Sequence, residues 1–141
     1  MPDMLLEEGL SEAVYYFLSE LKQGLGIEID YQHYGELPVM ATEYELMLYR
    51  IVQELAQNAI KHSKATQIIV QLNCTDNILS LTVEDNGIGF KPGPPQAGGI
   101  GIKNIQSRVA SLKGTIEINS EQGVGSSIYI ELDIHNLEKK L

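Results

Sequence analysis

An aspartate that ends a hydrophobic strand is the strongest chemical signal in this chain of 141 residues. Counting back by two from Asp85 reaches Val83, Leu81 and Leu79, and the side chains of a strand alternate between its two faces. Asp85 therefore points toward the core, where a carboxylate needs a hydrogen-bond donor. The neighbouring sequence supplies no obvious partner, so a ligand is the simplest donor. The alternative is an aspartate that stabilises a turn, since residues 85–87 read Asp-Asn-Gly.

A serine repeats this pattern at the start of the last predicted strand. Ser126 has the parity of the inward hydrophobic residues of that strand, which are Ile128, Ile130, Leu132 and Ile134. A lone inward serine is usually satisfied by a backbone group, so Ser126 alone is a weak signal. Together with Asp85, it suggests a polar pocket shared by two strand ends.

Three polar residues lie together on one flank of a long predicted helix. At about 100° per residue, Glu54, Asn58 and Lys61 lie beside the hydrophobic stripe of that helix. His62 is one step further along. Such a group can hold a hydrated Mg²⁺ and phosphates, because Mg²⁺ takes few protein oxygens and keeps several waters. An ordinary solvated helix flank is the alternative.

Glycines at the start of a later predicted helix are a weaker signal for an anion. Gly98, Gly99 and Gly101 let backbone amides approach a negative group, which the positive end of a helix also attracts. A flexible linker is the alternative. The segment does not have P-loop spacing, and it follows a loop where a dinucleotide-binding fold has a strand.

Hydrophobic periodicity predicts the elements that must position these residues. Helices are predicted over 9–24, 42–63 and 100–113, with Gly24 and Gly114 as stops and Thr42-x-x-Glu45 as a capping box. Strands are predicted over 27–31, 67–74, 78–85, 116–118 and 128–134, and the second and third form a hairpin.

This order of elements predicts one domain over residues 1–141. We expect an α/β (α+β) two-layer sandwich with helices on one face of a mixed, mostly antiparallel sheet. The glycine- and proline-rich segment 87–99 is a loop long enough to suggest a function. Residues 135–141 read as a frayed tail.

Composition narrows the class of protein. The net charge of −9, from 19 acidic against 10 basic residues, argues against a nucleic-acid partner and requires local neutralisation of any bound polyphosphate. The single cysteine, Cys74, excludes an internal disulfide and fits a reducing compartment. No stretch reaches the roughly 18–20 apolar residues of a membrane span and no signal peptide opens the chain, so we expect a cytoplasmic location.

Four segments, in this order, resemble the motifs of the catalytic ATP-binding domain of sensor histidine kinases. Residues 54–62 (ELAQNAIKH) resemble the N-box, 85–89 (DNGIG) the first glycine box, and 99–102 (GIGI) the second. Residues 123–126 (GVGS) resemble the closing G-T motif, with serine where threonine is commoner. The resemblance implies the Bergerat-type fold of the superfamily that includes DNA gyrase, the heat-shock chaperone ATPases and the mismatch-repair ATPases.

Further residues resemble the nitrate-sensor-like class of these kinases. They are Glu54 in place of the commoner Asn, a short lid, and the R-V-x-x-L-x-G pattern of residues 108–114. Residues 2–10 resemble the junction that follows the dimerisation helices of that class. This implies the cytoplasmic, C-terminal piece of a longer sensor, with or without a membrane anchor, in which residues 1–8 are a junction remnant.

The resemblance implies a role for each matching residue on the base side of an ATP site. Asp85 accepts a hydrogen bond from the adenine amino group, and Gly87 and Gly89 let the backbone pass close to the base. Ser126 completes the adenine contact through a water.

On the phosphate side, the resemblance implies that Asn58 is a ligand of Mg²⁺. The implied phosphate contacts are Lys61, His62 and Lys103. The lid, which includes Phe90 and Lys91, closes over the triphosphate through Gly99 and Gly101. Glu54 either assists removal of a proton from the incoming histidine or orients Mg²⁺.

The implied reaction needs partners that this sequence does not contain. None of His33, His62 and His135 has the setting of a phosphoacceptor, so the acceptor belongs to a dimerisation domain, with a response regulator downstream. The piece itself is expected to be monomeric. An anti-sigma-factor serine kinase is one alternative, and a nucleotide-binding domain without kinase activity is another.

Overall fold

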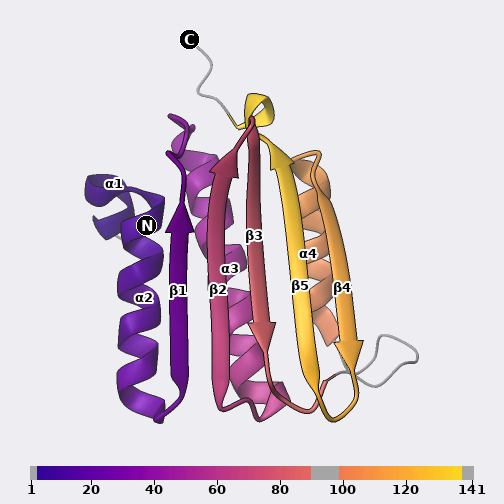
Figure 1. The fold of residues 1–141 in the computed structure, drawn as a ribbon. Coiled ribbons are helices and arrows are strands. Elements are labelled where there is room, and N and C mark those ends of the chain that lie inside the picture. Colours follow the sequence, from indigo (N-terminus) through magenta and orange to yellow (C-terminus); the bar gives the residue numbers. More distant parts are fainter. Residues whose placement is uncertain (1–2, 90–98, 138–141) are drawn as a thin grey trace.

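The computed structural model of the chain describes residues 3–89 and 99–137 (Figure 1). The elements, in chain order, are α1 (Asp3–Glu8), α2 (Leu10–Leu25), β1 (Glu28–Tyr34), α3 (Thr42–Ser63), β2 (Gln67–Thr75), β3 (Ile78–Asp85), α4 (Gly99–Ser111), β4 (Thr115–Glu121), β5 (Gly125–Asp133) and the 3-10 turn η1 (Ile134–Asn136). Within these residues, no helix is both long and apolar enough to cross a membrane. The predicted lid residues 90–98, with Phe90 and Lys91, lie outside the described part.

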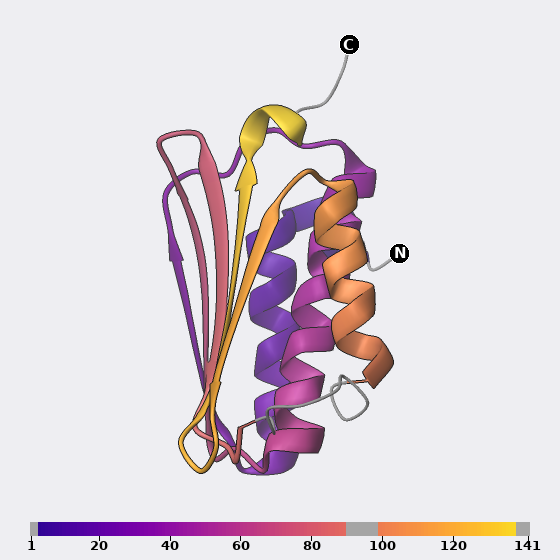
Figure 2. The ribbon, with the colours of Figure 1, turned by 90° about the vertical axis from the view of Figure 1, so that its right-hand side faces the viewer.

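The strands form one five-stranded sheet in the order β1-β2-β3-β5-β4. β1 runs parallel to β2, and every other neighbouring pair is antiparallel. The four helices cover one face of this sheet, as the side view in Figure 2 shows. The predicted two-layer sandwich with a mixed, mostly antiparallel sheet is confirmed.

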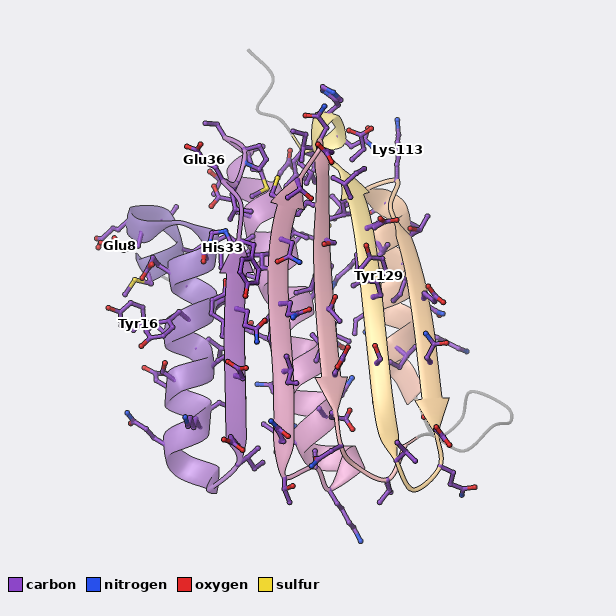
Figure 3. All side chains as sticks on the ribbon, in the orientation of Figure 1. Glu8, Tyr16, His33, Glu36, Lys113 and Tyr129 are labelled. Carbon is purple, nitrogen blue, oxygen red and sulfur yellow. The ribbon has the colours of Figure 1, made fainter. Side chains whose placement is uncertain are left out.

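The core lies between the sheet and the helices. Every second residue of the three central strands is buried there, namely Ile68, Val70 and Leu72 of β2, Leu79, Leu81 and Val83 of β3, and Ile128, Ile130 and Leu132 of β5. The predicted stripe of α3 packs against them, with Leu48, Val52, Leu55 and Ala59 all buried. The opposite face of the sheet is polar and open, with Tyr129 on it (Figure 3).

The hairpin between β2 and β3 is also confirmed. The strands pair antiparallel from Thr75 opposite Ile78 to Ile68 opposite Asp85. Asp76 and Asn77, between them, have φ values of 52° and 65°. Positive φ at both central residues defines the tight hairpin turn whose twist matches that of the strands.

The N-terminal helical region differs from the prediction of one helix over 9–24. Gly9, with φ 90°, separates α1 from α2, and Gly26, with φ 65°, ends α2 in place of Gly24. Residues 3–8, expected as a junction remnant, form α1, and its Leu5 is buried in the core. Periodicity placed the hydrophobic stripe correctly, but the backbone conformation at each glycine decided where the helices end.

The predicted capping box at Thr42 is wrong. The N-cap of α3 is Ala41, without a side-chain hydrogen bond, and its carbonyl accepts from the amides of Tyr44 and Glu45 at 3.0 and 3.2 Å. Thr42 is already the first helical residue. The Ala41 amide donates to the Leu137 carbonyl at 3.3 Å, so a contact with the C-terminal segment fixes this helix start.

α4 ends at Ser111, shortly before Gly114, the predicted stop, and Gly114 does not take a left-handed conformation. Lys113 takes that conformation, with φ 59°. A Cβ at position 114 would overlap the Leu132 side chain and would lie 2.7 Å from the Glu131 carbonyl oxygen. Glycine is needed at position 114 because the chain enters β4 there in close contact with β5.

The prediction of a frayed tail is wrong for residues 135–137. The Asp133 side chain accepts from the His135 amide at 2.9 Å and opens η1, and Leu137 is completely buried. So short a segment has no hydrophobic periodicity, and the burial of Leu137 therefore could not be predicted from the sequence. Residues 138–141 lie outside the described part.

Burial of Leu137 predicts a measurable loss of stability on truncation. Leu137→Ala should lower the free energy of unfolding by about 2 kcal/mol or more, through lost burial and a residual cavity. Leu6→Ala is the matched control, because Leu6 is 60% exposed, and it should change stability by no more than about 0.5 kcal/mol. Urea unfolding of the three proteins measures both values. Equal stability of wild type and Leu137→Ala would show that the segment is not part of the core.

Candidate functional site

Asp85 and Ser126 meet where the end of β3 pairs with the start of β5. The two residues are direct neighbours in the register, and Ser126 Oγ donates to Asp85 Oδ2 at 2.6 Å. Asp85 Oδ1 accepts from the Gly87 amide at 2.9 Å. The expectation that the chain supplies no partner for Asp85 is therefore wrong. One partner, the Gly87 amide, lies two residues away. The other is Ser126, so the predicted polar pocket shared by two strand ends is confirmed.

These two hydrogen bonds orient the carboxylate but leave part of its hydrogen-bond acceptor capacity unoccupied. A carboxylate has about four acceptor positions, and two of them are occupied here. Asp85 is half-buried, so the remaining positions are open to a ligand donor at lower dielectric than in water. The arrangement is a preorganised acceptor for an N–H group, with a hydroxyl beside it.

Asn86 was not predicted as important, yet it ties this strand end to the start of β2 and the residue before it. Its Oδ1 accepts from the amides of Thr66 and Gln67 at 2.9 and 3.0 Å, and its Nδ2 donates to Thr66 Oγ1 at 3.0 Å. Thr66 follows the end of α3 closely. The Asn of the Asp-Asn-Gly turn signal therefore fixes the first glycine box against the segment that joins α3, the helix of the N-box, to β2.

The glycines of the site have a packing reason in addition to the predicted approach to a base. Gly125 has φ 144°, and a Cβ there would overlap the Asp85 carbonyl oxygen. Gly89 has φ 76°, and a Cβ there would lie 2.5 Å from the Glu121 carbonyl oxygen. The Gly123 amide donates to the Ile88 carbonyl at 2.8 Å. The first glycine box thus packs directly on the turn between β4 and β5.

Among the described side chains of the predicted α3 flank, Glu54 is paired and Asn58 is not. Glu54 and Asn58 are half-buried and Lys61 is exposed, whereas the His62 side chain is not described. Glu54 accepts from Arg108 of α4 at 2.8 Å, an ion pair that sequence reasoning missed. Asn58 has no hydrogen-bond partner among the described residues, so its amide is available to a ligand.

The second glycine box lies at the start of α4. Gly99 and Gly101 both lie in the first turn, and no acidic residue of that turn offsets the positive end of the helix. Lys103 follows on an exposed position. This end of α4 suits a negatively charged group.

Among residues 3–89 and 99–137, no group of three His, Cys, Asp or Glu side chains could hold a metal ion by itself. A site for Mg²⁺ does not require such a group, because Mg²⁺ is commonly held by one or two protein oxygens, by phosphate oxygens and by waters. The free amide of Asn58 can supply one such oxygen.

Comparison with known proteins gives one family. The model of the family described as histidine kinase-, DNA gyrase B-, and HSP90-like ATPase matches residues 43–136. The chain is 35% identical over 134 residues to the sensor histidine kinase LiaS of Bacillus subtilis (strain 168), covering 95% of this chain and 36% of LiaS. It is 29% identical over 134 residues to the oxygen sensor histidine kinase NreB of Staphylococcus carnosus (strain TM300), covering 94% and 39%.

Solved structures agree in fold. The histidine kinase domain of the Erythrobacter litoralis EL346 blue-light activated histidine kinase aligns with a TM-score of 0.70 at 21% identity, over 86% of this chain and 59% of that chain. Full-length ShkA in complex with AMPPNP aligns with a TM-score of 0.69 at 28% identity, over 89% and 29%. In the sequence comparisons, the chain spans 36% of the length of LiaS and 39% of that of NreB, less than half of each relative.

The contact between Gly125 and Asp85 predicts a difference between two glycine substitutions. Gly125→Ala should destabilise the protein by about 2 kcal/mol or more, because overpacking and left-handed strain act together. Gly123→Ala is the control, since it also has positive φ (83°) but nothing lies within 4 Å of its Cβ, and it should cost about 1–2 kcal/mol. Urea unfolding measures the difference. Equal losses would mean that the close approach of β5 to Asp85 is not a constraint.

Proposed function

The chain belongs to the histidine kinase-, DNA gyrase B-, and HSP90-like ATPase family, and we propose that it is the ATP-binding catalytic domain of a sensor histidine kinase. In this role it transfers the γ-phosphoryl group of ATP to a histidine on a dimerisation domain outside the chain. The observation that carries the proposal is the Asp85 carboxylate, held by Ser126 and Gly87 with acceptor positions to spare.

The base side of the proposed site follows from the chemistry of adenine. The exocyclic amino group of adenine is a hydrogen-bond donor. At neutral pH, an oriented carboxylate is the strongest side-chain acceptor for it. Asp85 therefore receives the amino group, with Ser126 completing the contact through a water. Gly87 and Gly89 keep side chains away from the base.

The phosphate side combines a metal ligand with a few positive groups. Asn58 holds Mg²⁺, and Lys61, His62 and Lys103 contact the phosphates, together with Lys91 from the segment outside the described part. The amides of Gly99 and Gly101 at the start of α4 add positive partial charge. Because the chain has a net charge of −9, this local neutralisation is what makes a triphosphate acceptable.

The reaction itself is positioning and charge stabilisation. The bond between Pγ and the β,γ-bridging oxygen breaks, ADP leaves with the electron pair, and a P–N bond forms to an imidazole nitrogen of the acceptor histidine. The proton displaced from that imidazole goes to a base. Glu54, one helical turn before Asn58, is the carboxylate nearest in sequence to the proposed Mg²⁺ ligand.

The length of the relatives supports a partner domain. The chain covers 36% of LiaS and 39% of NreB, so both relatives have further segments in which an acceptor histidine can lie. A response regulator receives the group next, and we propose that this domain works in the cytoplasm. An anti-sigma-factor serine kinase and a domain that only binds nucleotide are the alternatives, and the experiment below separates them.

Radiolabelled ATP tests the proposed function. The chain alone should not become labelled, because His33, His62 and His135 lack an acceptor setting. A chimera of LiaS in which this chain replaces the 134 matched residues should become labelled, with unaltered LiaS as control. The label should be acid-labile, as phosphohistidine is. Strong labelling of the chain alone would overturn the proposed division of labour, and an acid-stable label on serine would favour the serine-kinase alternative.

The adenine assignment predicts a large effect of Asp85→Asn on nucleotide binding. The asparagine can present a donor to the adenine amino group, and loss of the charge-assisted hydrogen bond should cost about 1.5–3 kcal/mol, or roughly 10- to 150-fold in affinity. Asp76→Asn, in the distant hairpin turn, makes the same chemical change and should leave affinity unchanged. Calorimetric titration with ADP and Mg²⁺ compares them. Equal affinity of wild type and Asp85→Asn would exclude the adenine contact.

The metal assignment predicts a different signature for Asn58→Ala. Removing the amide should weaken nucleotide binding in the presence of Mg²⁺ while leaving binding in EDTA nearly unchanged, because only the metal-dependent part of the affinity is lost. Gln57→Ala, on the exposed neighbouring position, is the control. If the ratio of affinities with and without Mg²⁺ is the same in Asn58→Ala as in wild type, Asn58 is not a ligand.

A further inference from the structure

The ion pair between Arg108 and Glu54 joins two elements that the proposed function uses separately. Arg108 Nη1 lies 2.8 Å from Glu54 Oε2, and the side chains are 33% and 25% exposed. Glu54 belongs to the N-box on α3, and Arg108 lies about two turns beyond the second glycine box on α4. The contact therefore links the helix of the proposed Mg²⁺ ligand to the helix that opens toward the phosphates.

Arg108 is anchored well enough to act as a fixed point. Its neighbours Ile105 and Val109 are almost completely buried and hold α4 on the core. The guanidinium thus extends from a helix that cannot shift without disturbing the core. A charge-assisted hydrogen bond from such an anchored side chain restricts the rotamers of the carboxylate that accepts it.

The geometry leaves one oxygen of Glu54 available. Arg108 engages Oε2, and no hydrogen bond to Oε1 occurs among the described residues. Glu54 and Asn58 are i, i+4 neighbours on α3, so the free oxygen belongs to a carboxylate held one turn from the proposed Mg²⁺ ligand. An unrestrained glutamate would sample several rotamers at this point of the helix.

We propose that Arg108 is a positioning residue for phosphoryl transfer, which acts by holding the Glu54 carboxylate beside the N-box Asn58. The inference rests on the proposed function. Arg108 then governs the rate of transfer and not the affinity for nucleotide, because among the described residues Asp85 is held by Gly87 and Ser126 and not by Arg108 or Glu54. A purely structural ion pair of this exposure would contribute little to stability and would leave the transfer step unchanged.

The test uses the LiaS chimera with three substitutions of arginine. Arg108→Ala should lower the rate of self-labelling by about 10- to 100-fold, since misplacing a reacting group by about 1 Å can cost about 100-fold. Its dissociation constant for ADP with Mg²⁺ should stay within about twofold of wild type. Arg108→Lys, which keeps the charge, should recover part of the rate. Arg50→Ala removes an exposed arginine of α3 and should change neither quantity.

A double-mutant cycle shows whether Arg108 acts through Glu54. In a Glu54→Gln background, Arg108→Ala should cause no further loss of rate, because the side chain it positions is already neutralised. An equal loss in both backgrounds, or a loss of nucleotide affinity that matches the loss of rate, would overturn the positioning role. If the unsubstituted chimera binds ADP but is never labelled while LiaS is, the proposed function fails first, and the inference falls with it.

Discussion

The site depends on how closely the start of β5 approaches the end of β3. At that point Ser126 donates to Asp85, the Gly87 amide donates to the other carboxylate oxygen, and Gly125 leaves room for the Asp85 carbonyl. A carboxylate in a partly buried position is acceptable only because these donors compensate its lost hydration. The same donors fix its direction, so the structural requirement and the binding role are met by one arrangement.

Two polar contacts connect the elements around this arrangement. Asn86 ties the end of β3 to Thr66, just after α3, and Arg108 ties α4 to Glu54 in the middle of α3. The first glycine box is therefore fixed to the segment that follows the N-box helix, and the helix of the second glycine box contacts the N-box helix itself. In the proposed kinase domain, residues for the base and residues for the phosphates are thereby kept at fixed positions relative to each other.

Local periodicity carried most of the fold prediction. Alternation in β2, β3 and β5 and the stripe of α3 identified the core, and the order of elements indicated the two-layer sandwich. What failed depended on contacts distant in sequence. The parity of Asp85 and Ser126 indicated their shared pocket, but the hydrogen bond between them requires the register of β3 with β5. Arg108 as the partner of Glu54 requires the packing of α4 on α3, and the buried Leu137 lies at the start of α3, where its carbonyl accepts from the Ala41 amide. The helix ends at Gly26 and Lys113 depended on backbone conformation, which residue type alone does not fix.

The central claim is that adenine binds at the junction of β3 and β5. An NMR titration of the ¹⁵N-labelled chain with ADP and Mg²⁺ tests it most directly. The account predicts that the amide signals of Asp85, Gly87 and Ser126 shift with a single saturating dissociation constant, while those of Asp76 and Asn77 in the opposite hairpin turn do not. Unchanged signals at Asp85, Gly87 and Ser126 under millimolar ADP, or shifts confined to the hairpin turn, would contradict it.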